Sequence, residues 1–169
     1  MKGKLLVFLL VLLADQLTKY IAYTHLAVGE SQVIIPGLFN FTLVYNPGAA
    51  FGMFSSLTDG VRRVTLGLVS VLALIVVLRF MTKEAKHDII SQYALVGILA
   101  GAFGNIIDRG RFDSVVDFLD FYYQHYHWPA FNVADSAISV GVAVLMLRVL
   151  FAKEPGESTE LPAAGMTPG

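Results

Sequence analysis

The sequence has no cysteine and few charged residues. Only 15% of its 169 residues are Asp, Glu, Lys or Arg, against about 25% in a typical soluble domain. The lack of cysteine excludes a disulfide framework, a thiolate nucleophile and a cysteine-ligated metal. The net charge of −1 provides no positive field for nucleic acid, so we expect no nucleic-acid partner.

Apolar residues take the place of the missing charges. They make up 56% of the chain, and the mean hydropathy is +0.66. This composition is the opposite of that of disordered chains, and it leaves too little polar surface to cover a water-exposed globule. The sequence therefore predicts a membrane protein.

Four apolar segments are long enough to cross the membrane, which takes about 17–25 helical residues. They cover residues 5–23, 64–80, 89–107 and 130–151. None has the alternating pattern of outer-membrane strands, so we predict an all-α membrane protein with four transmembrane helices. Residues 1–153 then form one membrane domain, and the Pro-, Gly- and Glu-rich residues 154–169 form a flexible tail.

The first segment could also be a signal peptide, because Lys2 and Lys4 precede its apolar run. However, no small-x-small cleavage site follows, and the chain continues with Asp15 and Lys19 at helical spacing. These features favour a retained helix over a cleaved peptide.

The basic residues predict the orientation of the helices. Residues 24–60 contain no Lys or Arg, whereas basic residues gather before the first segment, between the second and third, and after the fourth. By the positive-inside rule, both termini are cytoplasmic and the first and third loops face outward. Four residues oppose this orientation: Arg62, Arg63, Arg109 and Arg111.

The first outer loop has a strand-like pattern. Phe39, Phe41, Leu43 and Tyr45 alternate with other residues, which predicts a strand with these four side chains on one face. Residues 33–35 are expected to pair with it as a hairpin, giving a small extracytoplasmic β-sheet within residues 31–55.

Ionisable residues in membrane helices are costly and are therefore functional candidates. The polar residues of this chain gather near the outer side of the predicted bundle. They are Asp15, Lys19, Asn105, Asp108, Arg109, Asp113, Asp117, Asp120, Asn132 and Asp135.

Asp117 and Asp135 are the strongest catalytic candidates. Asp117 lies between apolar residues in an outer loop, and Asp135 lies one turn into the fourth helix. Two carboxyl groups brought together share one proton, so the anion can accept a proton from water while the acid donates to a carbonyl oxygen. Alternatively, each Asp only caps a helix or pairs with Arg109 or Arg111.

Other chemistries have weaker support. His125 and His127 could bind zinc with Asp120, but no further ligand cluster supports a metal site. Ser136 could pair with Lys19, although Asp15 is four residues from Lys19. We expect no metal and no cofactor. A non-catalytic carrier or channel with structurally paired charges remains the alternative to a peptidase.

Five sequence blocks resemble those of the lipoprotein signal peptidases, also called signal peptidase II. In the family's order they are DQLTK (15–19), NPGAAF (46–51), GNIIDR (104–109), VVDF (115–118) and FNVADS (131–136). The resemblance implies an aspartyl endopeptidase of the bacterial inner membrane. Its substrates would be prolipoproteins carrying a diacylglyceryl-modified cysteine, with cleavage before that cysteine.

The resemblance also implies roles for individual residues. Asp117 and Asp135 would be the catalytic pair. Residues that bind the substrate or support the site would be Asn46, Asn105, Arg109, Asn132, Asp15, Lys19 and Asp108. The enzyme is expected to act as a monomer in contact with membrane lipid.

Overall fold

The computed structural model describes residues 2–48, 58–83, 85 and 88–151. In this part of the chain it has four long helices, which confirms the four predicted segments. They are α1 (Lys2–His25), α2 (Asp59–Lys83), α3 (Ile89–Phe112) and α4 (Val133–Leu150). All four are long and apolar enough to cross a membrane. The expected tail, residues 154–169, and residues 49–55 of the outer loop lie outside the described residues.

Most helix ends differ from the predicted bounds by a few residues, and local capping sets two of them. α3 continues to Phe112 and ends where Asp113 adopts a left-handed conformation with φ 55°. α4 begins only at Val133 because Asn132 is its N-cap, and the Asn132 side chain accepts a hydrogen bond from the Asp135 backbone N–H. Such caps satisfy backbone groups that a helix end leaves unpaired.

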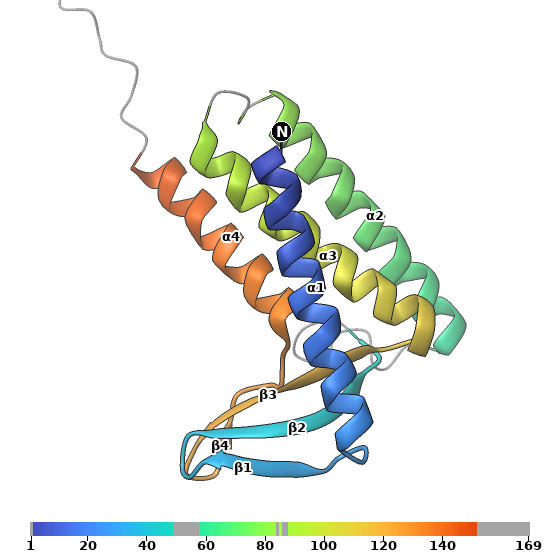
Figure 1. Ribbon diagram of the computed structural model, residues 1–169. Helices are drawn as coiled ribbons and strands as arrows, with labels where there is room; N and C mark the ends of the chain where they lie inside the picture. Colours follow the sequence, from blue (N-terminus) through green and yellow to red (C-terminus); the bar gives the residue numbers. More distant parts are fainter. Residues whose placement is uncertain (1, 49–57, 84, 86–87, 152–169) are drawn as a thin grey trace, which may run out of the picture.

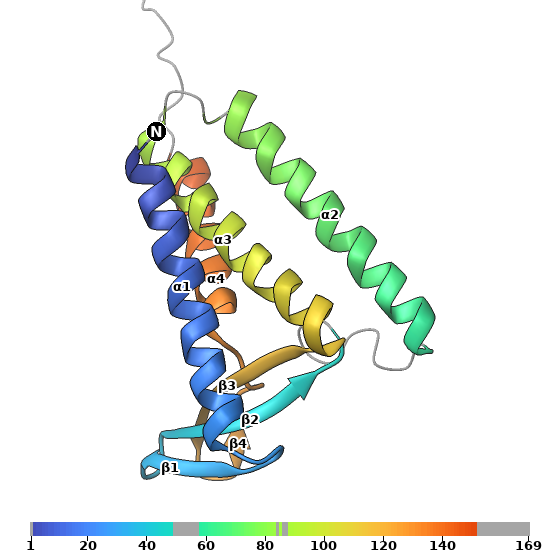
Figure 2. The ribbon, with the colours of Figure 1, turned by 45° about the vertical axis from the view of Figure 1, so that its right-hand side comes forward.

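The helices run roughly alongside one another, with the sheet at one end (Figure 1). α1 begins and α4 ends at the opposite end of the bundle, which we call the distal end. α3 packs against each of the other three helices. α2 packs chiefly against α3 and stands apart from α1 and α4 (Figure 2).

The sheet has four antiparallel strands in the order β1-β2-β3-β4. β1 (Ser31–Ile35) and β2 (Phe39–Asn46) form the predicted hairpin. The prediction missed β3 (Val115–Tyr123) and β4 (Tyr126–His127), which follow α3. Asp117 and Asp120 therefore lie on a strand, not in a loop. β3 escaped prediction because both of its faces carry buried residues, so its sequence does not alternate.

A β-bulge in β2 changes which side chains share a face. Phe41 pairs with Leu119, but the next pair joins Val44 to Asp117, so β2 carries one extra residue. The bulge interrupts the regular alternation that the sequence predicts. Phe41, Leu43 and Tyr45 nevertheless pack in or against one apolar core, whereas the Phe39 ring lies beside that of Phe121.

The end of α1 packs on the sheet through a small apolar core. This core contains Ala22, Leu26, Leu43, Val116 and Phe118, all at most 6% exposed. Burial of such side chains contributes about 25 cal/mol per Å² of apolar surface. The core fixes β3, with Asp117, relative to the helices.

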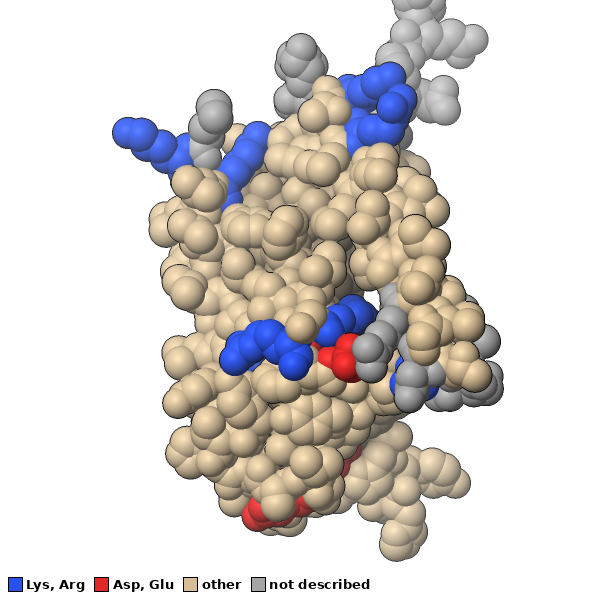
Figure 3. All heavy atoms as spheres, turned by 90° about the vertical axis from the view of Figure 1, so that its right-hand side faces the viewer, with Lys and Arg blue, Asp and Glu red and all other residues tan. Residues whose placement is uncertain are grey.

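Charged side chains lie in two zones along the bundle. Figure 3 shows Lys and Arg at the distal end and a second band of basic and acidic side chains where the helices meet the sheet. The surface between them on this face is uncharged. An uncharged zone between two charged ends is typical of a protein that spans a membrane.

Candidate functional site

The site lies where α3, α4 and β3 meet, and Asn132 is at its centre. The Asn132 side chain is fully buried. Its Nδ2 donates to Asp117 Oδ1 at 2.7 Å, and its Oδ1 accepts from the backbone N–H of Asp135 at 2.9 Å. One asparagine thus connects the two carboxylic residues that the sequence singled out.

Asp117 is held by two amide groups. It is 2% exposed, and Asn46 Nδ2 donates to its Oδ2 at 3.0 Å. The bulge in β2 places Asn46 for this bond, because Val44 and Asn46 oppose Asp117 and Val115. Burial, with a further contribution from the charge of Asp135, raises the pKa of Asp117 to about 7, and the bonds from Asn46 and Asn132 partly oppose the rise.

Asp135 is half-buried in the first turn of α4. Asn105 of α3 donates from Nδ2 to Asp135 Oδ1 at 2.8 Å. Asn105 Oδ1 in turn accepts from Lys19 Nζ at 2.9 Å and from Asn132 Nδ2 at 3.4 Å. Both carboxyl groups thus receive hydrogen bonds from asparagines, and these asparagines also contact each other.

A buried ion cluster of Asp15, Lys19 and Asp108 lies next to the two asparagines. Lys19 Nζ is 2.9 Å from Asp15 Oδ2 and 2.8 Å from Asp108 Oδ2, and all three side chains are at most 2% exposed. Asp15 Oδ1 accepts from the N–H of Ala134, and Asp108 Oδ2 accepts from the N–H of Val116. Burying these charges is tolerable because each is paired and hydrogen-bonded. The cluster thereby joins α1, α3, α4 and β3.

Two residues around the cluster were given no such role by sequence reasoning. Gln16 Nε2 donates to Asp15 Oδ2 at 3.1 Å and to Asp108 Oδ1 at 3.2 Å. A Cβ on Gly104 would collide with the Asp15 carboxylate. Gln16 lies within the first sequence block, but nothing in its type or position distinguishes it from a surface glutamine.

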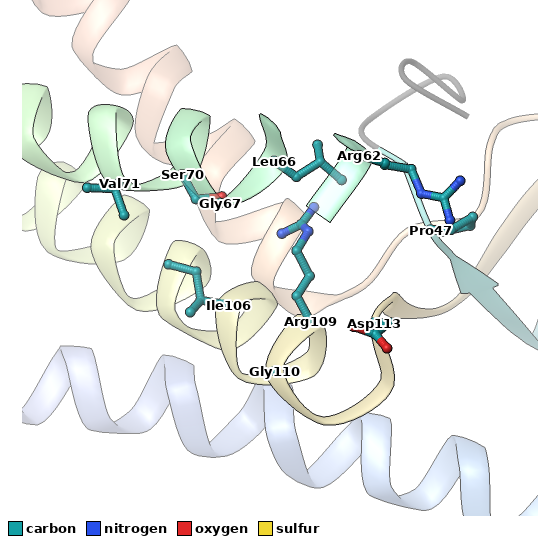
Figure 4. A pocket seen from close by; sticks show the side chains of 10 residues that line it. All are labelled: Pro47, Arg62, Leu66, Gly67, Ser70, Val71, Ile106, Arg109, Gly110 and Asp113. Atoms are coloured by element: carbon teal, nitrogen blue, oxygen red, sulfur yellow. The ribbon is translucent and has the colours of Figure 1, made fainter. Parts of the chain in front are cut away.

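Arg109 extends from α3 toward α2 and lines a cavity of about 310 Å³ (Figure 4). Its Nη2 donates to the carbonyl of Gly48 at 3.5 Å and its Nη1 to that of Asn105 at 3.4 Å. Its Nε is buried and has no hydrogen-bond partner among the described residues. Apolar side chains such as Leu66 and Val71 form much of the remaining wall. The cavity combines an apolar wall with a guanidinium group near the carboxyl pair.

The residues that the sequence offered for other chemistries, Asp120, His127 and Ser136, make different contacts. Asp120 accepts from Asn40 and is 2.8 Å from His127 Nδ1. In the described part of the chain no three His, Cys, Asp or Glu residues are placed to hold a metal ion. Ser136 donates to the carbonyl of Asn132 at 2.9 Å, so its hydroxyl makes a helical bond, whereas Lys19 belongs to the ion cluster.

Comparisons with known proteins give matches over most of the chain. The family described as signal peptidase (SPase) II matches residues 7–151. A lipoprotein signal peptidase of Desulforapulum autotrophicum is 45% identical over 150 residues, covering 89% of this chain and 93% of that protein. One of Syntrophus aciditrophicus is 43% identical over 154 residues, covering 89% and 96%.

Solved structures share the fold. A bacterial membrane enzyme solved by the in meso method at 2.3 Å resolution superposes with a TM-score of 0.83 at 32% identity, covering 95% of both chains. A second, at 1.9 Å resolution, gives a TM-score of 0.78 at 33% identity, covering 90% of this chain and 96% of that one.

These matches decide between the peptidase and the carrier or channel that the sequence left open. They extend over most of the chain, and the family match covers residues 7–151, the range in which the polar side chains of the site lie. The chain belongs to the signal peptidase II family, the membrane aspartic peptidases that process prolipoproteins.

Proposed function

We propose that the chain removes the signal peptide from diacylglyceryl-modified prolipoproteins, cutting just before the lipidated cysteine, with Asp117 and Asp135 as the catalytic pair. The observation that carries this proposal is the connection of both carboxyl groups through Asn132 and Asn105. The two groups differ in environment, since one is buried on a strand and the other is half-buried at the start of a helix. Carboxyl groups in unlike environments can divide the roles of acid and base.

The deeper burial of Asp117 is the basis on which we assign the roles. Asp117 is 2% exposed and its pKa is raised to about 7, so we assign it as the acid and the more exposed Asp135 as the anion. Asp135 accepts a proton from water as the water oxygen attacks the scissile carbonyl carbon, while Asp117 donates its proton to the carbonyl oxygen. When the tetrahedral intermediate collapses, the C–N bond breaks. Asp135 then gives its proton to the leaving amine, and the hydroxyl proton returns to Asp117.

Three polar side chains are proposed to align the substrate and the pair. Arg109 can donate to a peptide carbonyl from the cavity wall, and its buried Nε has a hydrogen bond still to make. Asn46 and Asn105 keep the carboxyl oxygens oriented. Asp15, Lys19, Asp108 and Asn132 hold α1, α3, α4 and β3 in place around them.

The depth of the site fits this substrate. Asp117 and Asp135 lie where the helices meet the sheet, which is the expected membrane–water interface. A cysteine anchored by acyl chains in the outer leaflet holds its preceding peptide bond at the same depth. The distribution of basic residues supports a multi-pass protein of the bacterial inner membrane with both termini cytoplasmic and the site facing the periplasm. We propose that residues 1–153 act as a single, monomeric domain.

The proposal is tested by incubating the purified protein with a diacylglyceryl-modified prolipoprotein. We expect cleavage before the modified cysteine, and a loss of at least about 10²-fold for Asp117→Asn and for Asp135→Asn, since each removes an acid–base group. Both variants should elute as folded protein with an unchanged helical spectrum. His127→Gln serves as the matched control, because it alters a titratable residue of the same sheet outside the site. Substantial turnover by either Asn variant would reject the catalytic pair.

A further inference from the structure

A second groove lies on another side of the bundle, away from Arg109 and its cavity. It has a volume of about 630 Å³, and α1, α3 and α4 contribute its walls. The lining is almost entirely apolar and includes Val11, Ala94, Gly97, Val140 and Val144. Gly97 leaves the groove open, because a Cβ there would meet only the Ala137 carbonyl, at 3.8 Å.

The groove faces away from the catalytic pair. On α4, Val144 follows Asp135 by nine residues, about two and a half helical turns, and so lies on the opposite face of the helix. A peptide that reaches Asp135 therefore runs along a different face of α4. The occupant of the groove is therefore something other than a peptide bound at Asp135.

Basic and polar side chains surround the distal end of this groove. Lys4 lies seven residues before Val11, on the same face of α1, and Lys4 Nζ donates to Gln92 Oε1 at 2.7 Å, beside the groove residue Tyr93. Arg148 lies one turn beyond Val144, and its side chain is 50% exposed while Nε contacts Asp88 at 2.9 Å. The groove's distal end thus carries Lys4 on α1 and Arg148 on α4, and the Asp88 carboxylate at the start of α3 is paired with Arg148.

We infer that the groove binds one acyl chain of an anionic phospholipid whose phosphate lies between Lys4 and Arg148. Basic pockets between transmembrane helices on the cytoplasmic side are suited to anionic head groups. On α4 the groove extends from Ala137 to Val144, about 10 Å at the helical rise, so it holds part of a chain. The basic n-region of a signal peptide would be repelled at this end, which excludes the substrate as occupant on charge.

The inference is tested by lipid binding to the full chain in detergent, measured by native mass spectrometry without any prolipoprotein. Phosphatidylglycerol should bind at least fivefold more tightly than phosphatidylcholine with the same acyl chains. Lys4→Gln combined with Arg148→Gln should abolish this preference, because each charge near a lipid surface contributes about fivefold in affinity. Equal affinity of the wild-type chain for the two lipids would overturn the inference.

A pair of tryptophan variants tests the groove itself. Val140 and Leu72 are 64% and 61% exposed, so both replacements should leave the fold intact, but only Val140 lines the groove. Val140→Trp should weaken phosphatidylglycerol binding at least fivefold, and Leu72→Trp should leave it unchanged. Equal effects would place the lipid elsewhere. Asp117→Asn should bind lipid normally, so this test stands apart from the proposed catalytic function.

Discussion

Helices α3 and α2 are of similar length but differ in what surrounds them. In α3, 56% of the apolar stretch is buried inside the protein, against 6% in α2. α3 carries Asn105, Asp108 and Arg109 on its buried or half-buried surface. A helix that meets protein on several sides can hold polar groups because its neighbours supply hydrogen bonds, whereas a helix that meets chiefly lipid cannot.

The same contrast applies to glycine. A Cβ on Gly101 of α3 would collide with the Ala134 carbonyl, whereas a Cβ on Gly67 of α2 would meet nothing within 4 Å. Small residues let membrane helices approach closely. Glycine is therefore required at the α3–α4 contact and is interchangeable with alanine on α2.

The largest effect on stability is expected from Lys19→Met, which removes the only cation of the buried cluster formed by Asp15, Lys19 and Asp108. Two carboxylates would be left without their partner, and breaking a buried ion pair costs about 3–5 kcal/mol. Thermal unfolding in detergent measures the loss. Adding Asp108→Asn to Lys19→Met should recover part of it. A double variant no more stable than the single one would show that charge imbalance is not the cause.

A smaller effect on stability is expected to distinguish the close packing of α3 from the looser packing of α2. Gly101→Ala forces the α3–α4 contact apart and is expected to cost about 1–3 kcal/mol, the usual price of overpacking. Gly67→Ala should change the free energy of unfolding by less than about 1 kcal/mol, in the stabilising direction, because alanine favours the helix. The free energy of unfolding of the two variants, measured under the same conditions, gives the comparison. Equal destabilisation would mean that α2 is packed as closely as α3.

The smallest effect concerns the pH dependence of cleavage. Since the pKa of Asp117 is raised to about 7, kcat/KM should fall as the pH rises through this value and the catalytic acid loses its proton. Asn46→Ala removes a donor that favours the anion, so the fall should move to higher pH, by up to about one unit. His127→Gln should leave the position of the fall unchanged. A shift to lower pH in Asn46→Ala would contradict the assigned role of Asn46.

The sequence predicts the four spans because length and composition alone decide them. It also predicts the β1–β2 hairpin, where polar and apolar residues alternate. It does not predict β3, whose buried residues lie on both faces, or the bulge that places Asn46 beside Asp117. Polar residues at the outer end are visible in the sequence, but their hydrogen bonds are not. The link from Lys19 through Asn105 to Asp135 joins residues 86 and 30 positions apart, and only packing defines it.

The most direct test of the account is the protonation of Asp117 itself. Infrared difference spectra of the purified protein should contain a protonated carboxyl band below pH 7 that disappears as the pH rises through about 7. The band should be missing from Asp117→Asn and unchanged in His127→Gln. A band that persists in Asp117→Asn, or a wild-type spectrum without a band at pH 6, would contradict the division of roles between the two carboxyl groups.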